Sequence, residues 1–99
     1  MKPEFNAYDE TAHQAVELAN RLAEQHQDAD LWDIADGLLA GAVHYWLYSR
    51  QPCDDPMCEE CLANRSPEER LVELLRLAEE FAKDSEHFHS ANDLKVGRA

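Results

Sequence analysis

Three cysteines lie within nine residues of one another and are the only cysteines of this 99-residue chain. Cys53, Cys58 and Cys61 form a C-x4-C-x2-C pattern, and four carboxylates lie between them: Asp54, Asp55, Glu59 and Glu60. A carboxylate beside a thiol disfavours thiolate formation, which argues against an activated nucleophilic cysteine. A bound cation removes that penalty, because metal ligation deprotonates and neutralises thiols. The pattern therefore favours a metal site over a catalytic cysteine.

The spacing of the cysteines suits zinc. Structural zinc takes four ligands, commonly four cysteines or three cysteines and one histidine. Cys53, Cys58 and Cys61 supply three thiolates, and His44 is the nearest histidine in the sequence. We therefore predict that, if a metal is bound, these four residues hold it and the metal is zinc.

Several alternatives to this ligand set remain open. His87 and His89 near the C-terminus are other candidates for the fourth ligand. C-x4-C-x2-C is also the first part of the plant-type ferredoxin pattern, so a redox or catalytic iron–sulfur site is an alternative, although no fourth cysteine follows Cys61. The cysteines could also stay reduced and pack in the loop, or Cys53 could form a redox-sensitive disulfide.

No signature of an enzyme accompanies the cysteines. The chain lacks a Gly-x-Ser-x-Gly elbow and a phosphate-binding glycine loop. Two E-x-x-H matches are present, Glu10 to His13 and Glu86 to His89, but about one is expected by chance in a chain with 21 acidic residues and five histidines, so the signal is poor. We therefore expect a non-enzymatic protein-interaction module with a cysteine-organised loop.

The charge balance excludes some partners. The formal net charge is −12, from 21 acidic and 9 basic residues, and no basic cluster is present. Nucleic-acid binding and binding to an anionic membrane both require clustered Lys and Arg, so neither is expected. No apolar run is long enough to cross a bilayer, and the odd cysteine count favours the reducing cytoplasm. The expected partner is a protein whose identity the sequence does not indicate.

Helical periodicity predicts an all-α fold, a small three-helix bundle. Apolar residues recur at helical spacing over residues 9–27, over 31–48, and from Ser66 to about Ser85 or His87. Asp9, Asp30 and Ser66 are the predicted N-caps, and Ser66-Pro67-Glu68-Glu69 reads as a capping box. The cysteines fall in the predicted linker, residues 49–65.

The middle helix carries a strip of small residues that suggests a second copy of the chain. Gly37, Ala40 and Gly41 lie on one side with His44, although mid-helix glycine costs about 1 kcal/mol relative to alanine. Close packing of another backbone is the usual reason for such a strip, so a homodimer is one prediction. We expect residues 1–99 to form a single domain, with 1–8 and 90–99 as flexible ends.

Overall fold

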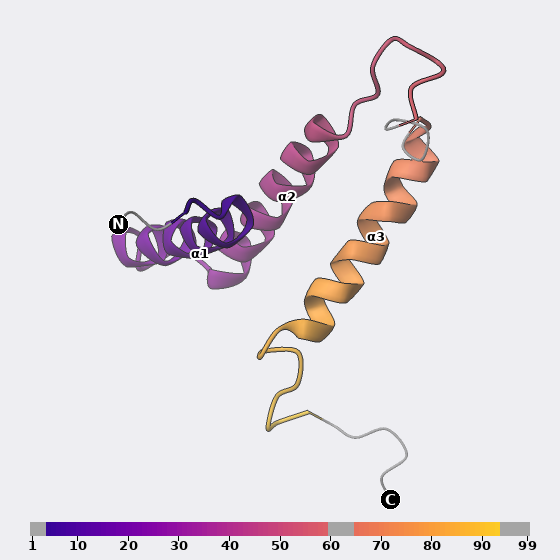
Figure 1. The fold of residues 1–99 in the computed structure, drawn as a ribbon. Coiled ribbons are helices and arrows are strands. Elements are labelled where there is room, and N and C mark those ends of the chain that lie inside the picture. The colour runs from indigo at the N-terminus through magenta and orange to yellow at the C-terminus, as the bar shows by residue number, and fades with distance from the viewer. Residues whose placement is uncertain (1–3, 60–64, 94–99) are drawn as a thin grey trace, which may run out of the picture. The chain divides into compact units, whose positions relative to one another are not determined.

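The computed structural model describes residues 4–59 and 65–93, and these form three helices. The helices are α1 (Ala7–Gln25), α2 (Leu31–Ser49) and α3 (Pro67–Asp84), as Figure 1 shows. No strand occurs among the described residues. The predicted all-α fold is confirmed, and so is the connection with cysteines between the second and third helices.

Helix α1 begins earlier than the sequence predicts. Asn6 is the N-cap, and its side-chain Oδ1 accepts a hydrogen bond from the backbone N–H of Asp9 at 3.0 Å. The prediction of Asp9 as the cap is therefore wrong, because Asn caps a helix as well as Asp does. Asp9 instead lies in the first turn, where a carboxylate interacts favourably with the helix dipole. Ala7 and Tyr8, predicted to belong to a flexible end, are helical.

Helix α2 begins at the predicted residue. Asp30 Oδ1 accepts from the backbone N–H of Trp32 at 2.9 Å, and the carbonyl of Asp30 accepts from the N–H of Ile34 at 3.2 Å. The helix continues to Ser49, whose Oγ donates to the carbonyl of Trp46 at 2.7 Å. Asp30 thus caps α2 as the sequence predicts.

Helices α1 and α2 pack against each other as a helical hairpin (Figure 1). The partly covered residues of α1 are Ala15, Ala19 and Ala23, which recur every four positions and so form one ridge. Alanine side chains let the two backbones approach closely. None of the residues of either helix is buried, because two helices alone enclose nothing between them.

Helix α3 has the predicted start. Ser66 Oγ accepts from the N–H of Glu69 at 3.0 Å, and Glu69 Oε1 accepts from the N–H of Ser66 at 3.1 Å. Pro67 occupies the first helical position, and Ser85 caps the C-terminal end. The backbone N–H groups of Ser66 and Glu69, which have no acceptor within the helix, are both satisfied by the capping box. This explains why the helix begins at this point.

The chain divides into two compact units, Met1–Ser49 and Arg50–Ala99. The first contains the α1–α2 hairpin, and the second contains the cysteine loop and α3. Among the described residues, no helix is both long and apolar enough to cross a membrane.

Candidate functional site

The described part of the cysteine loop is organised around Asp55. Its Oδ1 accepts from the backbone N–H of Met57 at 2.9 Å, and its carbonyl accepts from the N–H of Cys58 at 3.2 Å. The thiol of Cys53 also points to this carbonyl, with Sγ 3.8 Å from the oxygen. A side chain that accepts from the residue two positions later is an Asx-turn, which reverses the chain without a glycine. Asp55 therefore sets the local path between the first two cysteines.

Arg65 closes this loop from the other side. Its Nη1 donates to the carbonyl oxygen of Cys53 at 3.0 Å, and its Nη2 donates to the carbonyl oxygen of Asp55. The planar guanidinium reaches both acceptors at once, which an ammonium group could not do in the same way. Arg65, two positions before the first residue of α3, is thereby tied to the start of the loop. Sequence reasoning missed this role, since nothing in the local pattern marks Arg65.

The predicted metal ligands have different surroundings. Cys53 is exposed and Cys58 is partly covered. Cys61 lies outside the described residues. His44 belongs to α2 in the other compact unit. Among residues 4–59 and 65–93, no three His, Cys, Asp or Glu side chains are grouped closely enough to hold a metal. The zinc site therefore stays a prediction.

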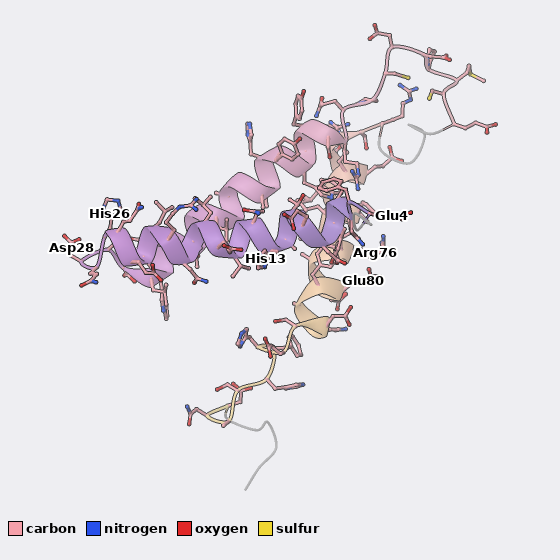
Figure 2. All side chains as sticks on the ribbon, turned by 60° about the vertical axis from the view of Figure 1, so that its left-hand side comes forward. Glu4, His13, His26, Asp28, Arg76 and Glu80 are labelled. Atoms are coloured by element: carbon pink, nitrogen blue, oxygen red, sulfur yellow. The ribbon has the colours of Figure 1, made fainter. Side chains whose placement is uncertain are left out.

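The remaining histidines are on the surface. His13 is exposed on α1 and pairs with Glu17 one turn later; Figure 2 shows it along the helix. His26 lies just beyond the end of α1 and is also exposed. His89 stacks edge to face on Phe88, with ring centroids 4.9 Å apart. These positions give no grouping of histidines in the described chain that resembles a metal site.

The most prominent feature of the hairpin is an open groove of about 690 Å³ along α1 and α2. Its lining is apolar except for Asp33 and the hydroxyl groups of Thr11, Tyr45 and Ser49. The small lining residues are Ala15, Ala19, Gly37, Gly41 and Ala42. The large lining residues are Leu18, Leu22, Ile34, Leu38, Tyr45 and Trp46. An open apolar surface that combines small and large residues is suited to contact with another protein.

The glycines of the middle helix contribute to the groove. A Cβ atom built on Gly37 or Gly41 would meet nothing within 4 Å outside its own helix turn. The close backbone neighbour expected from the sequence is thus not found among the described residues. Ala40 and His44, predicted to share the strip, do not line the groove. The two glycines of the strip instead line an open groove.

The charged face of α3 forms its own short-range pairs. Arg76 Nε donates to Glu73 Oε2 at 3.0 Å, and its Nη1 donates to Glu80 Oε1 at 2.7 Å; Figure 2 shows Arg76 and Glu80 together on the helix. The hydrogen bond from Arg76 lowers the pKa of Glu73 below its ordinary value of 4.5. Lys83 pairs with Glu79 at 3.1 Å. Pairs at these spacings are typical of a solvated helix face, so this cluster supports α3 and is no candidate site.

Comparison of the chain with protein-family models, with curated proteins and with solved structures finds no match. The groove and the cysteine loop are therefore the two features of the described chain that bear on its function.

Proposed function

We propose that this protein is a non-enzymatic protein-interaction module that binds its partner through the apolar groove of the α1–α2 hairpin. The observation that carries the proposal is the groove itself, which is apolar and open and whose lining contains one carboxylate, Asp33. An apolar concave surface on a helical hairpin fits an amphipathic helix, which places its apolar face in the groove.

The composition of α2 supports this proposal. Between Leu31 and Ser49 the only formally charged residues are Asp33 and Asp36. A helix that is apolar around most of its circumference is ordinarily covered on most sides. In the hairpin, however, Trp32 remains 80% exposed, Leu39 63% and Tyr45 69%. Contact with another protein would cover surface that α1 alone leaves open.

Photocrosslinking tests the proposal. A photoreactive phenylalanine analogue in place of Tyr45 should form a protein adduct in the cytoplasm, where we propose that the module acts. The same analogue in place of Asp36, which does not line the groove, serves as the control position. Gly41→Leu should abolish the Tyr45 adduct and Ala40→Leu should leave it intact. Equal adducts at both positions, or none at Tyr45, would refute a groove-specific contact.

A second candidate function, metal binding at the cysteine loop, is favoured by the order around Cys53 and Cys58. Asp55 and Arg65 hold the backbone at these two cysteines through hydrogen bonds, which reduces the entropy that metal binding would have to overcome. Zinc held by Cys53, Cys58 and Cys61 is the proposed form, with His44 as the predicted fourth ligand.

Elemental analysis of the reduced protein tests this second candidate. We expect one equivalent of zinc in the wild type and loss of zinc in Cys58→Ser, because a thiolate ligand is removed. Replacement of His44 by Gln then distinguishes a histidine ligand from a water molecule. Metal-free wild-type protein would refute the candidate, and visible absorption with bound iron would favour the iron–sulfur alternative.

A further inference from the structure

We propose that the occupant of the groove is the same groove of a second copy of the chain, so that two α1–α2 hairpins form a four-helix bundle. This inference rests on the proposed function, because it names the partner that the groove binds. Three properties of the groove carry it.

The first property is a shape that can be complementary to itself. A two-fold symmetric interface uses the same patch on both subunits, so that patch must contain both projections and recesses. The groove lining combines small and large residues, because Gly37, Gly41 and Ala15 line it together with Leu18, Tyr45 and Trp46, and the space above the two glycines is open. The large side chains of one copy can therefore enter the open space above the glycines of the other, as knobs enter holes between packed helices.

The second property is the placement of charge. The chain has a net charge of −12, so two copies repel each other at long range. The groove lining contains only one carboxylate, Asp33, and the other carboxylates of the hairpin lie outside it. Two copies can consequently meet through the groove without burying a row of like charges. A basic partner would find few carboxylates in the groove with which to pair.

The third property is the size of the face. Each helix of the hairpin has 19 residues. Such a helix is about 28 Å long and about 10 Å wide, so a face of two helices projects on the order of 560 Å². Side-chain relief makes the accessible area larger than this projection, which brings it towards the ~800 Å² per partner of a standard interface. The face is therefore large enough for a specific dimer.

Sedimentation equilibrium of the full chain tests this inference. We expect a monomer–dimer equilibrium whose dissociation constant falls as salt is raised, because salt screens the repulsion between acidic copies. Gly41→Leu should raise the dissociation constant roughly tenfold or more, since a leucine fills the open space above the glycine. Ala40→Leu is the matched control on the same helix and should leave the constant unchanged. Circular dichroism verifies that both variants keep their helix content.

The crosslinking probe at Tyr45 separates failure of this inference from failure of the proposed function. An adduct of two chains supports the second copy. A wild-type protein that is monomeric at every concentration overturns the inference, and an adduct of Tyr45 with a different protein then leaves the proposed function standing. A crosslink from Tyr45 to residues 67–84 of the same chain overturns both. Dimerisation that Ala40→Leu disrupts and Gly41→Leu preserves overturns the assignment to the groove.

Discussion

The guanidinium of Arg65 joins the two ends of the cysteine loop, because its Nη1 donates to the carbonyl oxygen of Cys53 at 3.0 Å. The two residues are twelve positions apart in the chain. A second donor of the same side chain reaches the carbonyl of Asp55, which also accepts from the N–H of Cys58. One arginine thus restrains the backbone beside Cys53 and Cys58 through two carbonyl oxygens.

Replacing Arg65 should loosen the loop. We expect Arg65→Ala to increase the rate at which thiol reagents modify Cys58 by about fivefold, the factor that corresponds to losing about 1 kcal/mol of hydrogen bonding. Arg65→Lys should recover only part of the protection, because one ammonium group cannot reproduce the planar fork. Alkylation kinetics followed by mass spectrometry measure the modification rate of Cys58, with Arg21→Ala on α1 as the control. Equal rates in wild type and Arg65→Ala would show that the loop does not depend on Arg65.

Removing the cap of α3 should destabilise that helix. Ser66→Ala is expected to cost about 1 kcal/mol, because the N–H of Glu69 loses its acceptor at the helix start. Denaturant unfolding followed by circular dichroism measures the loss. Glu69→Gln is the matched control, since glutamine can still accept from the N–H of Ser66. An unchanged midpoint and slope in Ser66→Ala would indicate that the cap contributes nothing to stability.

The ion pairs of α3 predict a pH dependence. The hydrogen bond from Arg76 lowers the pKa of Glu73 in the folded chain. The contribution of this pair to folding stability is therefore complete above the ordinary glutamate pKa of 4.5. It is lost as the pH falls through the lowered folded-state value. Arg76→Gln should therefore raise the pKa of Glu73 towards 4.5, which NMR titration of the carboxyl carbon can follow. Lys83→Gln is the control, because it removes a cation that pairs with Glu79, and it should leave the pKa of Glu73 unchanged.

Adding a methyl group at Gly41 should stabilise the monomeric protein. A Cβ atom on Gly41 meets nothing within 4 Å outside its own helix turn, so Gly41→Ala should gain about 1 kcal/mol from helix propensity alone. The measurement is thermal or denaturant unfolding at protein concentrations below the dissociation constant. Gly37→Ala should behave in the same way, and a lower melting temperature for both would mean that a backbone packs on this strip within one chain.

Local patterns in the sequence were sufficient to predict the helices. The capping box at Ser66 and the cap at Asp30 are confirmed, because each depends on residues two or three positions apart. The start of α1 was predicted three residues too late, since Asn6 and Asp9 are both good caps and their spacing is close to one helical turn. The alanine ridge of α1 was also readable, because helical periodicity places Ala15, Ala19 and Ala23 on one side.

The groove and the contacts of Arg65 with the cysteine loop could not be predicted from the sequence, because both depend on tertiary structure. The sequence by itself determined that Gly37 and Gly41 share one side of α2, but only the packing of α1 decided that these two residues line an open groove. In the same way, the cysteine spacing determined that the chemistry of this chain is concentrated between α2 and α3. The contact of Arg65 with Cys53 spans twelve positions, and helical periodicity carries no information over a non-helical connection of that length. Such contacts depend on the path of the backbone, which the turn at Asp55 sets, and only the folded chain shows where that path leads.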